Sequence, residues 1–367
     1  MKTIRRLIYR EVLSAVVFVA AGFLALFFFF DFVDELPNVG KAGGFATYRL
    51  TQALLYITLL MPNHLYELLP IAVLIGTIFV MARLAQSSEY TILRTSGLGP
   101  GRALRTLMVL GLAFAALTFA VGDYLSPAAD KAAQLLRARY QGRISIGQTG
   151  AWLKERQAQT TYNVNVAALA PDGSMQGVRL FEADDRGRMV STTTAPRAVF
   201  GVDGWVLEDA EVTSFLTSGP APQVEHRTVA ELQWPTRITP EMVSVALLKP
   251  DRMSTVALFE YIQHLEENGQ TSQRYEIEFW RKVFYPLSCL VMVVMALPFA
   301  YLHFRAGGIT SYVFVGVLIG ISFFLLNNVF GYIGNLRSWW PWLTAAAPGL
   351  LYSLLSLGAF TWLVLRR

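Results

Sequence analysis

The sequence predicts an α-helical membrane protein with six transmembrane helices and one inserted all-β domain. Of its 367 residues, 54% are hydrophobic and only 16% are charged, which is well below the ~25% charged residues usual in soluble domains. The hydrophobic residues form membrane-length runs towards both ends of the chain, whereas the middle of the chain alternates between apolar and polar residues. These two patterns require two different environments within one polypeptide.

Six apolar runs approach the ~20 residues that cross a bilayer as a helix. They cover residues 12–30, 65–82, 107–121, 283–302, 309–330 and 343–365. Pro62 and Asn63 separate the second run from an apolar stretch at 45–61, which we interpret as an interfacial helix lying along the membrane surface. Asp123 and Pro127 are expected to end the third run. The first run is too long for the apolar core of a cleavable signal peptide.

Between the third and fourth runs, from residue 144 to residue 243, the pattern changes to the period of two that is typical of strands. Asp172-Gly173 and Asp203-Gly204 are dipeptides that favour tight turns between apolar segments. Short strands separated by such turns predict a sandwich or barrel-like β domain. Strands are expected after residue 160 and at 178–183, 198–202, 205–209 and 211–216.

An amphipathic helix at 254–268 follows the strands, capped by Ser254 and ended by Gly269. We therefore expect three parts. Residues 1–127 contain the first three spans, residues 128–270 contain the β domain with flanking helices, and residues 271–367 contain the last three spans.

The positions of the basic residues predict the orientation. Cytoplasmic loops of membrane proteins carry an excess of Lys and Arg. With six spans, both termini lie on that side, and the β domain lies on the opposite side. The net charge of +5 therefore reflects membrane topology rather than nucleic-acid binding. The basic residues near the cytoplasmic span ends are Lys2, Arg5, Arg6, Arg10, Arg83, Arg94, Arg102, Arg105, Arg305, Arg366 and Arg367.

A short polar helix is predicted at about 84–97, between the second and third spans. Glu89 near its start and Arg94 near its end complement the helix dipole. Gly97 suits the left-handed residue that ends a helix, and Pro100 prevents its continuation. Such a helix is either an ordinary loop helix with a solvated face or a segment that receives force from a soluble partner.

The sequence contains no motif of a catalytic or metal site. It lacks a phosphate-binding loop, a His-Glu-x-x-His motif and a Gly-x-Ser-x-Gly motif. The single cysteine, Cys289, lies in an apolar run, and with only four histidines a Cys/His zinc site is not expected. The predicted spans carry almost no charge, whereas ion or proton pathways usually need ionisable groups at depth.

Two further groups of residues allow alternative interpretations. Gly316-Val-Leu-Ile-Gly320 is either a chance pattern or a site where two helix backbones approach closely. Lys41, Arg137 and Arg139 lie near span ends on the non-cytoplasmic side, against the charge bias. They are either solvated side chains that complete helix dipoles or cations that meet anionic lipid head groups.

Several motifs resemble the permeases of the lipopolysaccharide-export ABC transporter, the LptF/LptG family, and the resemblance covers the whole chain. Within this family, Asp31-Phe-Val-Asp34-Glu-Leu36 after the first span resembles the G member more than the F member. The motifs are Leu60-Met-Pro62, Glu67-Leu-Leu-Pro70-Ile-Ala-Val-Leu-Ile-Gly76, Leu84-Ala-Gln-Ser-Ser-Glu89, Arg94-Thr-Ser-Gly97, Arg274-Tyr-Glu-Ile-Glu-Phe-Trp-Arg-Lys282, Tyr285-Pro286-Leu287 and Ala296-Leu-Pro298-Phe299.

The resemblance implies a non-catalytic inner-membrane subunit that exports lipopolysaccharide towards the outer membrane. It implies pairing with a paralogous six-span permease (LptF-like) around a cavity, and binding of a cytoplasmic ATPase dimer (LptB-like) that uses ATP and Mg²⁺, while this chain binds no cofactor. The β domain would be a periplasmic jelly roll that joins a single-span bridge protein (LptC-like) and a soluble one (LptA-like).

The resemblance also implies roles for individual residues. The coupling helix that docks into the ATPase would carry Glu89, Tyr90, Leu93 and Arg94. The first and fifth spans would form the lateral gates, with Gly316 and Gly320 in close approach. Relatives tend to place lysines just after the first span, where this chain has Asp31 and keeps only Lys41. Lysine-based contact is therefore less expected than contact of lipid phosphates with Arg137 and Arg139.

Two other classes of protein are compatible with the same architecture. One is a membrane-anchored periplasmic enzyme, which would need convergent titratable residues in the β domain. The other is a structural anchor that presents the β domain, which would not require a Glu-bearing helix between spans and would purify without an ATPase.

Overall fold

The computed structural model describes residues 2–40, 48–87, 89–95, 97, 99–141, 150–157, 160–170, 172–216, 223–246, 250–301 and 308–362. Two compact units make up the chain. The helical unit comprises Met1–Asp34, Leu60–Ala129 and Gln273–Arg367, and the inserted unit comprises Glu35–Leu59 and Asp130–Ser272.

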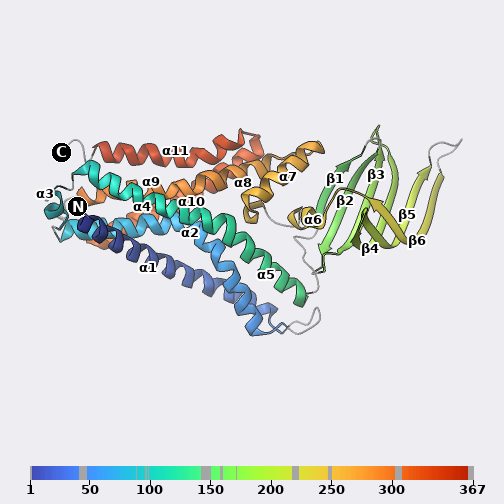
Figure 1. Cartoon of the computed structure of the whole chain (residues 1–367), viewed down its shortest axis with the longest axis horizontal. Coiled ribbons are helices and arrows are strands. Elements are labelled where there is room, and N and C mark those ends of the chain that lie inside the picture. The colour runs from blue at the N-terminus through green and yellow to red at the C-terminus, as the bar shows by residue number, and fades with distance from the viewer. Residues whose placement is uncertain are drawn as a thin grey trace. The chain divides into compact units, whose positions relative to one another are not determined.

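Six helical segments of the described residues are long and apolar enough to cross a membrane, which confirms the predicted fold class. The fourth span is α8, α9 and the short turns η4 and η5 in series. The helices are α1 (Lys2–Glu35), α2 (Leu50–Gln86), α3 (Glu89–Thr95), α4 (Pro100–Ala120), α5 (Ser126–Gln141), α8 (Gln273–Phe284), α9 (Ser288–Ala296), α10 (Ile309–Arg337) and α11 (Pro341–Phe360), with single turns η1 (Leu36–Asn38), η2 (Val121–Leu125), η4 (Tyr285–Leu287) and η5 (Leu297–Tyr301) (Figure 1).

Two predicted helix breaks are wrong. Pro62 does not separate an interfacial helix from the second span. Instead, α2 runs unbroken from Leu50 to Gln86, with Pro62 and Pro70 inside it. The third span does not end at Asp123 either, because the π-helical turn η2 joins α4 to α5. Transmembrane helices tolerate proline because neighbouring helices, side chains and local changes of helix type satisfy the freed backbone groups.

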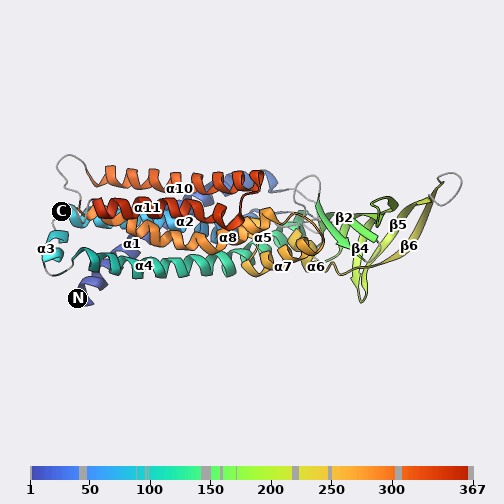
Figure 2. The ribbon, with the colours of Figure 1, turned by 90° about the horizontal axis from the view of Figure 1, so that it is seen from above.

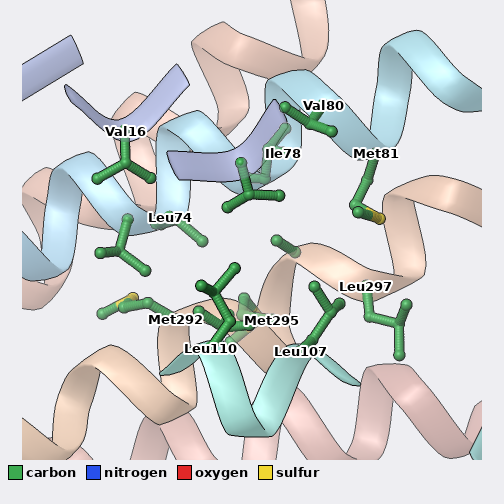
Figure 3. Packing of buried hydrophobic residues seen from close by; sticks show 14 of the residues in the cluster. Val16, Leu74, Ile78, Val80, Met81, Leu107, Leu110, Met292, Met295 and Leu297 are labelled. Carbon is green, nitrogen blue, oxygen red and sulfur yellow. The ribbon is translucent and has the colours of Figure 1, made fainter. Parts of the chain in front are cut away.

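The core of the helical unit lies where α1, α2, α4 and α9 meet (Figure 3). The α1 helix contributes a stripe of buried residues four positions apart, as expected for one helix face. A small residue on α2, Gly76, lets the two backbones approach. A methyl group built on Gly76 would lie 2.8 Å from both Cγ2 and the backbone nitrogen of Val16. The buried stripe of α1 is Ile8, Val12, Val16 and Ala20.

Gly76→Ala is therefore expected to destabilise the protein. The added methyl group meets backbone atoms of α1, which cannot move away without shifting the helix. Overpacking of this kind costs about 1–3 kcal/mol. Thermal unfolding in detergent measures the effect, and Gly22→Ala on α1 is the matched control because its methyl group meets nothing within 4 Å. Equal melting temperatures for both variants would contradict the close packing of α1 on α2.

The inserted unit contains one antiparallel sheet of six strands among the described residues, in the order β1-β2-β3-β4-β5-β6. The turn at Asp172-Gly173 joins β2 to β3, and Gly173 has a positive φ of 83°, as the sequence predicted. The turn before Gly204 joins β4 to β5. The strands are β1 (Ala151–Arg156), β2 (Thr160–Leu169), β3 (Met175–Asp184), β4 (Met189–Gly201), β5 (Gly204–Leu216) and β6 (Gln223–Pro235).

The strand order differs from the expected jelly roll in one respect. A jelly roll has two sheets with Greek-key connections, whereas each described strand pairs with its neighbours in the chain, as in a meander. Short turns keep consecutive strands adjacent. The segments predicted as separate strands at 205–209 and 211–216 form the single strand β5, which accommodates Asp209 at a positive φ of 51°.

One face of the sheet is buried and includes Val164, Met175 and Trp205. The segment after β6 packs on this face together with α6 (Pro240–Ala246), and the Trp205 indole donates a hydrogen bond of 2.7 Å to the Ile238 carbonyl. After η3 (Pro250–Arg252), helix α7 (Thr255–Glu267) begins as predicted. The Ser254 hydroxyl accepts a hydrogen bond from the backbone nitrogen of Ala257 at its start.

Candidate coupling and lipid-contact sites

Helix α3 covers Glu89–Thr95 and is shorter than the predicted range of 84–97, because residues up to Gln86 continue α2. Gly97 has a positive φ of 99°, as expected at this position, and its N–H donates a hydrogen bond of 3.1 Å to the Arg94 carbonyl. Within the helical unit, α3 lies at the same end as the first turns of α1 and the last turns of α11 (Figures 1 and 2).

The predicted coupling residues lie on two faces of α3. Glu89 and Arg94 are exposed, as is Ile92, whereas Leu93 is partly buried and Tyr90 is almost fully buried. Burial raises the pKa of the Tyr90 phenol far above its ordinary value. The outward face can meet a soluble partner, and the inward face anchors α3 to the core.

Tyr301, at the end of η5, receives the inward face of α3. The rings of Tyr90 and Tyr301 pack edge to face with centroids 5.2 Å apart. The Arg94 guanidinium carbon lies 5.8 Å from the centre of the Tyr301 ring, within reach of a cation–π interaction. No local sequence motif relates Tyr301 to a helix more than two hundred residues earlier, so its contact with α3 was not predictable from the sequence.

Basic residues gather at the same end of the helical unit. Arg83 is paired with Glu11 at 2.6 Å, and Arg102 donates a hydrogen bond of 2.9 Å to the Gly97 carbonyl. A groove of about 1000 Å³ runs along α1 here, and its lining changes from arginine to apolar side chains. Arg305, Arg366 and Arg367 lie outside the described residues. The groove is lined by Arg5, Arg6, Tyr9, Arg10, Leu13, Ser14, Val17 and Leu110.

Arg137, on α5, is enclosed by an acidic and an aromatic side chain of the inserted unit. Its Nη1 donates a hydrogen bond of 3.1 Å to the Tyr56 hydroxyl, and its Nη2 lies 3.8 Å from Oε2 of Glu35. The guanidinium also lies over the Tyr56 ring, 5.2 Å from its centre. Of the other predicted head-group residues, Lys41 and the side chain of Arg139 lie outside the described part of the chain.

The hydrogen-bonding groups of Glu35 and Arg137 are only partly paired. Glu35 is 5% exposed, and its Oε1 and the Nε of Arg137 are buried without a hydrogen-bond partner among the described residues. Burial and the neighbouring Glu35 carboxylate raise the pKa of the Tyr48 phenol well above its ordinary value. Arg137 therefore carries an internal counter-ion, which the sequence analysis did not identify.

Arg137→Gln is expected to destabilise the protein by about 2 kcal/mol, because the Glu35 carboxylate stays buried without a cation. Adding Glu35→Gln to this variant removes the unpaired charge and is expected to restore most of the loss. Thermal unfolding in detergent of the wild type, both single variants and the double variant measures the coupling. A double variant no more stable than Arg137→Gln would show that the two side chains do not depend on each other.

Gly316 and Gly320, on α10, face α2. Methyl groups built on the two glycines would lie 2.8 Å from Ile78 Cδ1 and Ile71 Cγ2, respectively. The glycine pair thus allows close packing of the fifth span on the second. Whether the first and fifth spans form a lateral gate stays a prediction.

Polar contacts between spans were missed by the sequence analysis. His64 on α2 lies 2.8 Å from Asp31 on α1. Lys282 on α8 is 6% exposed and donates a hydrogen bond of 2.9 Å to the Gly122 carbonyl in the π-helical turn. Its charge lies inside the span because the helix begins at Gln273, ten residues before the predicted run at 283–302. No group of three or more metal-ligating side chains is found within the described residues.

The fold and these sites define a multi-pass membrane protein with an inserted β-sheet unit. The chain belongs to the family described as lipopolysaccharide export system permease LptF/LptG, whose profile matches residues 6–366. Membership makes it an inner-membrane transport protein, a permease subunit.

Two relatives carry the name of the G member, in agreement with the sequence analysis. The lipopolysaccharide export system permease protein LptG of Escherichia coli (strain K12) is 28% identical, over 92% of this chain and 90% of that protein. The LptG protein of Haemophilus influenzae (strain ATCC 51907 / DSM 11121 / KW20 / Rd) is 25% identical, over 100% of this chain and 99% of that protein.

Proposed function

We propose that this permease transmits the work of a separate cytoplasmic ATPase to lipopolysaccharide in the inner membrane. The lipid would be extracted and passed to a periplasmic bridge that leads to the outer membrane. The observation that carries this proposal is α3, a helix with an exposed charged face and a buried aromatic anchor, placed between two spans of a family permease. ATP and Mg²⁺ would be bound by an LptB-like ATPase dimer, and this chain would bind no cofactor.

The proposed orientation places the basic end of the helical unit in the cytoplasm. Arginines of α1, α2 and α4 gather there with α3, which agrees with the charge bias of cytoplasmic loops. Both termini would then be cytoplasmic and the inserted sheet periplasmic. Residues 1–127, 128–270 and 271–367 would act as the first three spans, the periplasmic part with its flanking helices, and the last three spans.

The lipid would occupy a cavity shared with an LptF-like permease, gated by the first and fifth spans. Arg137, together with Arg139 and Lys41, would contact the anionic head group. Because Glu35 already lies beside Arg137, the lipid phosphate would have to compete with this carboxylate. The sheet would join LptC-like and LptA-like bridge proteins, and β1 and β6 are its edge strands among the described residues, so their unpaired backbone groups suit strand addition.

Glu89→Lys tests the docking of the ATPase. Glu89 is exposed, so reversing its charge is expected to leave folding unchanged while weakening ATPase binding roughly tenfold, which corresponds to about 1.4 kcal/mol. The measurements are the recovery of ATPase with the tagged permease and the release of lipopolysaccharide to a bridge protein. The control is Glu260→Lys, on the exposed face of α7 in the inserted unit. Normal recovery and full transport with Glu89→Lys would contradict the coupling role.

A further inference from the structure

We infer that Tyr301 is a positioning residue through which a displacement of α3 reaches the fourth span directly. This inference rests on the proposed docking of α3 to an ATPase. By chain connection alone, α3 acts on its neighbours α2 and α4. Tyr301 adds a third attachment, to η5 and hence to α9 and α8.

The contact between α3 and Tyr301 is buried and closely packed, so a displacement of α3 would displace Tyr301 as well. Tyr90 and Tyr301 are only 4% and 8% exposed, and both belong to the main hydrophobic core of the helical unit. Their rings meet edge to face at 5.2 Å, and Arg94 approaches the same Tyr301 ring from one turn further along α3. Tyr90 and Arg94, which are four residues apart on α3, therefore both contact the Tyr301 ring. Close-packed aromatic contacts of this kind do not deform continuously.

The fourth span is also joined tightly to α4, the helix that follows α3. A methyl group on Gly111 of α4 would lie 3.2 Å from the Leu290 Cα of α9, so the two helices approach closely. The Thr118 hydroxyl lies 3.2 Å from the Cys289 sulfur, and further along Lys282 donates to the Gly122 carbonyl at 2.9 Å. The α4 helix and the fourth span are thus connected at three levels and would move together.

These two elements are the ones that lead along the chain to the two ends of the β sheet. The α4 helix leads through η2 into α5, and α8 directly follows α7. A displacement of α3 would therefore act on both covalent connections of the β sheet, through Gly97 to Pro100 on one side and through Tyr301 on the other. Tyr301 would therefore couple lipid transport to the movement of α3 on the side of the fourth span.

Substitution of Tyr301 tests this inference in the complete transporter, reconstituted in proteoliposomes with lipopolysaccharide and a bridge protein. Tyr301→Leu removes the ring, and Tyr301→Phe keeps it. Tyr312→Leu is the matched control, because Tyr312 of α10 forms a similar edge-to-face pair with Phe299 of η5, with ring centroids 5.8 Å apart. Two quantities are measured, the recovery of the ATPase and the lipid transferred per ATP hydrolysed.

Tyr301→Leu is expected to retain the ATPase and its hydrolysis, but to lower the lipid transferred per ATP by roughly fivefold or more, the lower end of typical allosteric coupling. Tyr301→Phe and Tyr312→Leu are expected to stay within twofold of the wild type, a margin set well inside that roughly fivefold effect. If Tyr301→Leu transferred as much lipid per ATP as the wild type, or lost the ATPase, the role of Tyr301 would be overturned. The proposed function would not be affected by either result. A wild-type complex that neither retains an ATPase nor transfers lipid would overturn the proposed function as well.

A second measurement needs no variant. Amide hydrogen exchange of the wild-type complex is compared with and without a non-hydrolysable ATP analogue. Amide exchange is expected to change in α3 and also in η5 (Leu297–Tyr301). A change in α3 with none in η5 would overturn it.

Discussion

The packing around α2 is the constraint on which the rest of the helical unit depends. Of the most apolar part of α2, 83% is buried inside the protein, compared with 17% for α1 and for α10. In a membrane, apolar residues gain little by leaving lipid for protein, so helices associate through close van der Waals contact. Glycines provide that contact here, at Gly76 towards α1 and at Gly316 and Gly320 towards α10. The more exposed α1 and α10 are available for lipid or a second permease.

This central position of α2 would let the short helix α3, in its proposed coupling role, act on the whole unit. α3 directly follows α2 and precedes α4, and its inward face is part of the same core. The chain connections are not the only attachment of α3, because Tyr90 is also buried against Tyr301. In the proposed function, the exposed charge of Glu89 would respond to a partner, while Tyr90 and the Arg94 guanidinium over the Tyr301 ring would pass the movement on. The same division into two faces argues against a simple structural anchor, which would not need it.

The sequence allowed prediction of those features that depend on composition and local pattern. The six spans, the turn at Gly173 and the cap at Ser254 follow from apolar length, glycine conformation and hydroxyl capping. The continuity of α2 through Pro62 was not predictable from local rules, because it depends on neighbouring helices that satisfy the backbone. The partners of Arg137 and Tyr90 were also missed. Glu35 lies far from Arg137 in the sequence, and Tyr301 lies far from Tyr90. Only the tertiary fold brings each pair into contact.

Site-specific photo-cross-linking in membranes tests the central claim most directly. A photoreactive amino acid is placed at Ile92, which is 63% exposed on α3, and in a second variant at Val202, which is fully exposed at the turn between β4 and β5. The photoreactive group at Ile92 is expected to capture a cytoplasmic ATPase, and the one at Val202 is expected never to capture it. An actively exporting variant whose Ile92 position captures no ATPase, or whose Val202 position captures it, would contradict the proposed coupling and the orientation together.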